Sequence, residues 1–224
     1  MGDLKKSFNE RAYQYDQWIQ GICPYYEDAL KALIYVLPAR AHFILELGCG
    51  TGNLSVRLLE KYPHAQLTVV DISPIMLEVT KQKVKKYENQ VSFVEKHFES
   101  FQSKYRFDII VSSLAIHHVD TKGKERLFDT VFKMLDGNGY FYIVDSVYGA
   151  SKEIERINHQ VWIDYMKSHD VPDNEIQNAL QRREEHDKCD PLFLQLGLLK
   201  KAGFVAIDVI WKYYGIAVFG ARKY

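Results

Sequence analysis

Cysteine is scarce in this sequence. Cys23, Cys49 and Cys189 are odd in number and lie far apart among 224 residues. Neither a disulfide framework nor a zinc-binding spacing emerges from that pattern, and free thiols suit a reducing compartment. We therefore expect a cytoplasmic protein.

The chain also lacks an excess of charge of either sign. Basic and acidic residues number 29 each, so the formal net charge is zero. A nucleic-acid partner usually requires a basic face that neutralises backbone phosphates. We therefore expect no nucleic-acid partner.

Long apolar runs are missing as well. The longest, at about residues 29–37, contains Lys31 and is too short to span a bilayer. Residues 1–16 are polar and lack the apolar core of a secretory signal. These observations argue against a membrane partner. The oligomeric state stays open, with a homodimer as one alternative.

What the sequence does contain is a regular alternation of short β-branched runs with longer helical patterns. The runs are continuously apolar, which is typical of strands that helices bury on both faces. Repeated strand–helix units predict a parallel sheet with right-handed crossovers in one α/β domain, residues 1–224. The expected strands are residues 42–47, 66–71, 91–95, 107–112 and 140–145.

Two further strands are expected at residues 204–212 and 214–222, separated only by a tight turn. A parallel return would need a crossover of a dozen or more residues, so these strands must pair antiparallel. The expected sheet is therefore mostly parallel, with a reversed C-terminal edge strand.

Two helical segments lie outside this alternation. Residues 1–40 precede the first strand, and residues 150–188 form a charged insertion before the terminal hairpin. We interpret both as a lid over the carboxyl ends of the strands, where open α/β sheets bind ligands. Peripheral packing is the alternative interpretation.

The most specific local pattern is ELGCGTG, residues 46–52, directly after the first expected core strand. Glycines at alternate positions let the backbone turn tightly and approach a ligand closely. The spacing G-x-G-x-G differs from the G-x-G-x-x-G of dinucleotide-binding folds. It suits a zwitterionic methionine tail, whose ammonium group Glu46 could bind directly or through water.

Asp71 ends the next expected strand. An acidic residue at this position can accept hydrogen bonds from both ribose hydroxyls of a nucleoside. Capping of the helix that begins near Pro74 is the alternative role. Ile72 and Met76 are candidates for packing on an adenine ring, although ordinary core packing would also explain them.

Three motifs, ELGCGTG, VVDISPIML and FDIIVSSLAIHHV, resemble those of class I S-adenosylmethionine-dependent methyltransferases. The likeness is greatest to the group that includes the ubiquinone and menaquinone C-methyltransferases. It is strong over residues 42–145 and looser at both ends of the chain. The resemblance implies S-adenosylmethionine as cofactor and a Rossmann-like, seven-stranded sheet with a reversed seventh strand.

The resemblance also implies which residues bind the cofactor. The turn at residues 48–52 would hold the methionine part, Asp71 the ribose, and Ser112 and Ser113 the cofactor tail. The family usually has an aspartate for the adenine amino group where this sequence has His97, a departure that a neutral imidazole acceptor could accommodate. The expected cofactor-binding residues are Tyr15, Glu46, Gly48, Cys49, Gly50, Asn53, Asp71, Ile72, Met76, His97, Phe98, Ser112 and Ser113.

His117 and His118 follow the fourth expected strand, near the expected position of the transferable methyl group. Adjacent residues of extended structure face opposite sides, so we expect at most one of them to reach the substrate. His117 is the candidate catalytic base. A hydrogen-bonded loop anchor is the alternative role.

Aromatic residues recur in the candidate lid and in the terminal hairpin. They suit a flat or apolar acceptor and can attract a sulfonium by cation–π contact, although core packing is the more common use. Tyr15 is the best candidate, because the family's Tyr-Asp element often closes over the cofactor. The others are Tyr13, Trp18, Trp162, Tyr165, Trp211, Tyr213 and Tyr214.

No metal site is expected. The residues that could contribute ligands have a spacing that fits no tetrahedral ligand set, and a charged helical surface explains them equally well. They are His159, His186, Asp187, Cys189 and Asp190.

The sequence therefore predicts in-line methyl transfer from S-adenosylmethionine to a small molecule. SSLA stands where exocyclic amino-group methyltransferases carry an Asn-Pro-Pro-Tyr-like element, which argues against DNA bases or protein glutamine as acceptors. Two alternatives remain. One is a tRNA-modifying enzyme of the same fold, and the other is a cofactor-binding protein that transfers no methyl group or alters the cofactor itself.

Overall fold

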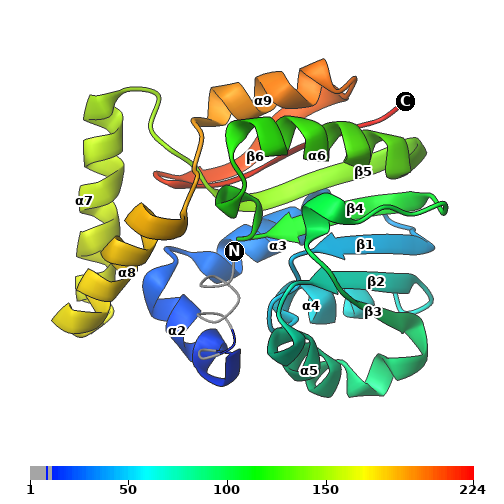
Figure 1. The fold of residues 1–224 in the computed structure, drawn as a ribbon, viewed down its shortest axis with the longest axis horizontal. Coiled ribbons are helices and arrows are strands. Elements are labelled where there is room, and N and C mark those ends of the chain that lie inside the picture. Colours follow the sequence, from blue (N-terminus) through cyan, green and yellow to red (C-terminus); the bar gives the residue numbers. More distant parts are fainter. Residues whose placement is uncertain (1–8, 10–11) are drawn as a thin grey trace.

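The computed structural model describes residues 9 and 12–224, so residues 1–8, 10 and 11 of the expected lid lie outside the described residues (Figure 1). Within the described part of the chain, seven strands form one sheet in the order β3-β2-β1-β4-β5-β7-β6. The parallel strands are β1 (Phe43–Leu47), β2 (Gln66–Asp71), β3 (Val91–Glu95), β4 (Phe107–Ser113) and β5 (Leu135–Ser146).

The reversed C-terminal strand is confirmed. β7 (Ile216–Arg222) pairs antiparallel with β5 and with β6 (Val205–Tyr213). Because β7 inserts between β5 and β6, the edge of the sheet is formed by β6. The expected α/β class and its mostly parallel sheet are thus both found.

Helices cover both faces of the sheet. Neighbouring side chains of β1 explain why: Ile44 and Leu45 point to opposite faces, and each is buried in a different apolar core. One core includes helices α3 (Tyr26–Val36), α4 (Asn53–Lys61) and α5 (Pro74–Lys83), and the other includes α6 (Thr121–Met134) and α9 (Leu192–Lys201).

Helix α3 belongs to this core and not to a lid. Its Leu30 and Leu33 are fully buried, and the helix packs against β5, β6 and β7. The expected lid over the whole of residues 1–40 is corrected for this helix, because its apolar side is needed to cover one face of the sheet.

The remaining helices form a separate group. α2 (Tyr15–Ile22), α7 (Lys152–Ser168) and α8 (Asp173–His186) share a small apolar cluster. In Figure 1, α7 and α8 stand beyond the end of the sheet at which the parallel strands finish. Trp162 Nε1 donates a hydrogen bond of 2.7 Å to the Ile22 carbonyl, which joins α7 to α2.

Short 3-10 helices complete the fold: η1 (Ala12–Gln14), η2 (Lys85–Gln90), η3 (Phe98–Ser100) and η4 (Ile116–His118). Helix α5 starts after Ser73, whose hydroxyl accepts the Met76 N–H at 3.0 Å, with Pro74 as the first helical residue. Within residues 9 and 12–224, no helix has both the length and the apolar character needed to cross a membrane.

Candidate active site

A cavity of about 840 Å³ opens where β1, β2 and β4 end. Every residue expected to bind the cofactor lines it except Ser112: Tyr15, Glu46, Gly48, Cys49, Gly50, Asn53, Asp71, Ile72, Met76, His97, Phe98 and Ser113. We call it the cofactor cavity. Six other wall residues were not assigned to the cofactor from the sequence. Thr51, Leu114, Ala115 and His118 lie within the quoted motifs, whereas Tyr26 and Leu54 lie outside them.

The glycine turn between β1 and α4 shapes this cavity. Gly48, Gly50 and Gly52 all have positive φ, at 72°, 52° and 82°. A Cβ on Gly48 would lie 2.4 Å from the Cβ of Ala115, and one on Gly52 would lie 2.8 Å from a methyl group of Thr80. Larger residues would therefore be strained and would collide with the cavity wall.

Asp71 connects the turn to the neighbouring strand. Its carboxylate accepts the Gly50 N–H at 2.8 Å and the Ser73 N–H at 2.9 Å. Burial raises the pKa of this carboxyl, while the backbone hydrogen bonds from Ser73 and Gly50 oppose that rise. Each carboxylate oxygen can accept two hydrogen bonds, so acceptor capacity remains for ribose hydroxyls.

Glu46 lies beneath the same turn. It is almost fully buried, and Ser55 donates a hydrogen bond of 2.5 Å to its Oε2. Burial raises the pKa of Glu46 to about 8. A nearby ammonium group would favour its charged form, as the methionine part of the expected cofactor requires.

The two serines at the end of β4 have different roles, because successive residues of a strand face opposite sides. Ser112 donates a hydrogen bond of 2.7 Å to the Leu47 carbonyl and does not line the cofactor cavity, which corrects its expected role. Ser113 lines the cavity, and its buried hydroxyl has no hydrogen-bond partner among residues 9 and 12–224. It is thus available to a bound molecule.

The far end of the cavity is aromatic. His97 and Phe98 stack with ring centroids 5.2 Å apart and planes inclined by 26°. Nδ1 of His97 lies 3.4 Å from a carboxylate oxygen of Glu99. Met76 is buried nearby in the wall, so this end offers flat and polarisable surfaces that fit a purine.

A second cavity of about 880 Å³ adjoins the first, and the two share Tyr15, Leu114 and His118. It lies among α2, α7, α8 and the turn between β6 and β7. Of the expected aromatic residues, Trp18, Trp162, Tyr213 and Tyr214 line it together with Tyr15, whereas Tyr13, Tyr165 and Trp211 do not.

Asn158 of α7 also lines the second cavity. Its side chain is buried, and neither its amide nitrogen nor its amide oxygen has a hydrogen-bond partner within the described part of the chain. A buried amide without partners costs about 1–3 kcal/mol of stability. The arrangement suits a bound molecule that supplies the missing hydrogen bonds.

Both histidines of η4 line the second cavity, with ring centroids 4.0 Å apart. The expectation that at most one of them reaches the substrate assumed extended structure, whereas residues 116–118 form a 3-10 turn. Nδ1 of His117 lies 2.5 Å from Oδ1 of the fully buried Asp145. Asp145 was missed and Asp187 was considered only as a metal ligand, because only the fold brings the two carboxylates to this turn.

The charges around η4 shift several pKa values. Burial lowers the pKa of His117, but Asp145 and Asp187 outweigh burial and leave it raised. Burial and the neighbouring His117 lower the pKa of His118. Burial raises the pKa of Asp187, yet its attraction to both histidines leaves it lowered.

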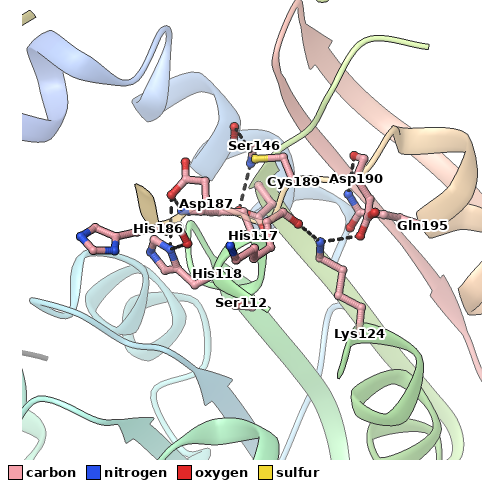
Figure 2. A network of polar contacts seen from close by, with 12 residues as sticks. Ser112, His117, His118, Lys124, Ser146, His186, Asp187, Cys189, Asp190 and Gln195 are labelled. Carbon is pink, nitrogen blue, oxygen red and sulfur yellow. Dashed lines mark hydrogen bonds and ion pairs between the residues drawn. The ribbon is translucent and has the colours of Figure 1, made fainter. Parts of the chain in front are cut away.

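The segment after α8 is anchored beside η4. The Lys188 N–H donates a hydrogen bond of 2.6 Å to the His117 carbonyl. The fully buried Lys124 pairs with Asp190 at 2.6 Å, as Figure 2 shows. Of the residues considered earlier as metal ligands, Asp187 alone joins the histidine cluster found among residues 9 and 12–224.

The sequence of this chain is similar to those of known proteins. A family model described as a methyltransferase domain matches residues 44–139. The chain is 29% identical over 136 residues to malonyl-[acyl-carrier protein] O-methyltransferase 1 of Ilyobacter polytropus, covering 61% of this chain and 49% of that protein. It is 26% identical over 215 residues to carboxy-S-adenosyl-L-methionine synthase of Campylobacter jejuni, covering 93% of this chain and 90% of that protein.

Solved structures agree on the fold. Human N-acetylserotonin methyltransferase in complex with S-adenosylmethionine has a TM-score of 0.66 at 18% identity, covering 96% of this chain and 56% of that one. The N-methyltransferase NodS from Bradyrhizobium japonicum in complex with S-adenosyl-L-homocysteine has a TM-score of 0.60 at 17% identity, covering 88% and 85%. The present chain therefore spans about half of some relatives and most of others.

The sheet order and the glycine turn define a Rossmann-like fold. The matched proteins associate this fold with enzymes that bind S-adenosylmethionine. Together these findings support a class I S-adenosylmethionine-dependent methyltransferase.

Proposed function

We propose that this enzyme transfers the methyl group of S-adenosylmethionine to a small-molecule acceptor bound in the second cavity. The observation that carries the proposal is the common wall of the two cavities, formed by Tyr15, Leu114 and His118. In-line transfer requires the sulfonium and the acceptor to be aligned and shielded from water. Two cavities that meet at one wall would bring the sulfonium and the acceptor together for such a transfer.

In the cofactor cavity, the proposed pose follows the donors and acceptors. Glu46 and the glycine turn would hold the methionine part, and Asp71 would accept the ribose hydroxyls. His97 and Phe98 would flank the adenine. Ser113 is proposed to donate its hydroxyl to the cofactor tail, because this group is buried and lines the cavity.

The proposed acceptor is a flat or apolar small molecule with at least one polar group. The aromatic side chains of the second cavity favour such a molecule, and Asn158 would bind its polar group. A nucleic acid is disfavoured by the zero net charge of the chain. Helices α2, α7 and α8 are proposed to close over the acceptor, and a cytoplasmic location belongs to the same proposal.

His117 is the proposed catalytic residue. It lines the second cavity close to the common wall, and Asp145 holds its Nδ1. Its Nε2 lies 3.6 Å from Oδ1 of Asp187, which also lines the second cavity. Replacing His117 by Ala should lower turnover strongly while the affinity for S-adenosylhomocysteine, measured by calorimetry, stays nearly unchanged.

The carboxy-S-adenosyl-L-methionine synthases support a second candidate function, because they match this chain over most of its length. In that case the enzyme would alter the cofactor itself, and the second cavity would hold the donor of the carboxyl group. The two candidates give different products from the same cofactor.

One experiment tests both candidates. The purified enzyme is incubated with S-adenosylmethionine carrying a labelled methyl group and with a metabolite extract, and the products are separated by mass spectrometry. Methyl transfer predicts S-adenosylhomocysteine and a labelled acceptor. A carboxylated cofactor that retains the label would support the second candidate, and an unchanged cofactor in every extract would contradict both.

A further inference from the structure

A cluster of three side chains lies where the two cavities meet. His117, His118 and Asp187 each offer one ligand atom, and these atoms lie within 4.8 Å of one another. All three residues line the second cavity, and His118 lines the cofactor cavity as well. Figure 2 shows the cluster beside the anchored segment that follows α8.

Asp187 lies between the two histidines, and its contact with His118 is a long hydrogen bond. Oδ1 of Asp187 is 3.6 Å from Nε2 of His117 and 3.3 Å from Nδ1 of His118. A charge-assisted hydrogen bond between such groups spans about 2.7–2.9 Å. Ligand atoms around a tetrahedral zinc ion lie about 3.3 Å apart, because each is about 2.0–2.1 Å from the metal. The two separations from Asp187 are close to that value, and all three ligand atoms lie within 4.8 Å of one another.

The tautomer of His117 adds independent support. Nδ1 lies 2.5 Å from the buried carboxylate of Asp145, which also accepts the Ser146 N–H at 2.9 Å. Nδ1 therefore carries the proton, and the lone pair of Nε2 is turned toward the Asp187 carboxylate. An imidazole held by a carboxylate in this way is the usual arrangement behind a metal ligand. Two facing electron-rich atoms require a positive centre between them, either a proton or a metal ion.

We propose that Nε2 of His117, Nδ1 of His118 and Oδ1 of Asp187 together bind one divalent transition-metal ion, with Asp145 as the positioning residue. Two imidazoles and one carboxylate are a donor set suited to zinc or iron(II), and three protein ligands leave positions open to the second cavity. The proposal that the ion binds rests on the geometry of these side chains and does not depend on the proposed methyl transfer.

A catalytic role for the ion rests on the proposed methyl transfer. An acceptor hydroxyl that ligates the ion would release its proton to solvent more readily. The oxygen would then attack the methyl carbon: the carbon–oxygen bond forms as the carbon–sulfur bond breaks, and S-adenosylhomocysteine leaves. The acceptor class is thus narrowed to molecules with a hydroxyl or enol that can reach the ion.

Metal titration of the intact enzyme tests the site. Chelator-treated protein is titrated with Co²⁺ and followed by visible absorption, and bound Zn²⁺ is counted by mass spectrometry after dialysis. We expect about one Zn²⁺ per chain. The visible spectrum should be that of Co²⁺ with few ligands, and added Zn²⁺ should displace the Co²⁺. Asp187→Asn and His118→Ala should each weaken Zn²⁺ binding at least tenfold. His186→Ala is the matched control and should leave it unchanged, because this neighbouring histidine is outside the cluster.

Calorimetry with S-adenosylhomocysteine on the same samples separates this proposal from the proposed function. A wild-type protein that binds S-adenosylhomocysteine but takes up no Zn²⁺ and gives no Co²⁺ spectrum would overturn the metal site. Equal Zn²⁺ uptake by the wild type and both ligand variants would overturn it too. Turnover that depends on His117 without any metal uptake would identify the positive centre as a proton. Should a variant fail to fold, the wild-type Co²⁺ spectrum still decides.

Discussion

The two cavities that meet at His118 are built in different ways. The cofactor cavity is formed mostly by the ends of neighbouring parallel strands and the turns that follow them. The second cavity is formed by α2, η4, α7, α8 and the β6–β7 turn, which lie far apart in the chain. The first cavity is therefore determined locally, whereas the second exists only once distant helices have packed.

The polar groups of the cavities differ in the same way. In the cofactor cavity, the carboxylate of Asp71 accepts backbone N–H groups from Gly50 in the glycine turn and from Ser73 just after β2. In the second cavity, the side-chain amide of Asn158 has no hydrogen-bond partner among residues 9 and 12–224. Backbone hydrogen bonds thus fix Asp71 in the cofactor cavity, whereas the described residues provide no such bonds to the amide of Asn158 in the second cavity. Four predictions sharpen or break this comparison.

The largest effect is expected for Gly48→Ala. Positive φ and a Cβ only 2.4 Å from the Cβ of Ala115 should together distort the turn. We expect binding of S-adenosylhomocysteine to weaken roughly a hundredfold, which is about 3 kcal/mol of binding free energy. Calorimetry measures the affinity. Gly197→Ala on α9 is the control, because a Cβ there meets nothing within 4 Å. Equal affinities in the two variants would show that the turn tolerates a side chain.

The next effect concerns Glu46 and pH. Its pKa is about 8 in the folded protein against an ordinary value of 4.5, so between these pH values the folded state holds a proton that the unfolded state has lost. Its contribution to stability is complete below pH 4.5 and is lost as pH rises toward 8.

Denaturant unfolding of the cofactor-free protein at several pH values measures this loss, and Glu46→Gln is the matched variant. The amide cannot ionise, so the variant should lose less stability than the wild type over the same pH interval. Parallel stability curves for the two proteins would show that Glu46 does not hold the extra proton.

Asp71→Ala should weaken cofactor binding by about 1–3 kcal/mol through lost ribose hydrogen bonds. Asp108→Ala is a close control, because Asp108 also accepts two backbone N–H groups, those of His42 and Phe43, at the start of β1. Calorimetry should show weaker binding for the first variant only. Unchanged affinity in Asp71→Ala would rule out its ribose role.

The smallest effect is expected in the second cavity. Asn158→Leu removes a buried amide that lacks partners within the described residues, so the unfolding free energy should rise by about 1 kcal/mol. The acceptor should bind more weakly, with a higher KM and unchanged affinity for S-adenosylhomocysteine. Thermal unfolding and kinetics measure the two effects, and a less stable variant with normal KM would contradict the proposed role of Asn158.

Much of the cofactor cavity could be predicted because its residues directly follow strands. The acidic ends of β1 and β2 and the glycine turn are visible as continuous motifs, and parallel strands bring their carboxyl ends to one edge. Ser113 lines the cavity and Ser112 does not, because one residue of register decides which serine faces it. The second cavity could be anticipated only as aromatic residues near a lid, and Asn158 gave no signal in the sequence.

The sequence by itself determined the class of fold, the reversed C-terminal strand and the glycine turn with Asp71, because periodicity, turn length and backbone strain act over a few residues. Tertiary structure alone decided that α3 packs against the sheet, that β6 forms the edge, and that Asp145 and Asp187 face His117. Those outcomes depend on which buried surfaces meet when distant segments pack, and no local pattern encodes that choice.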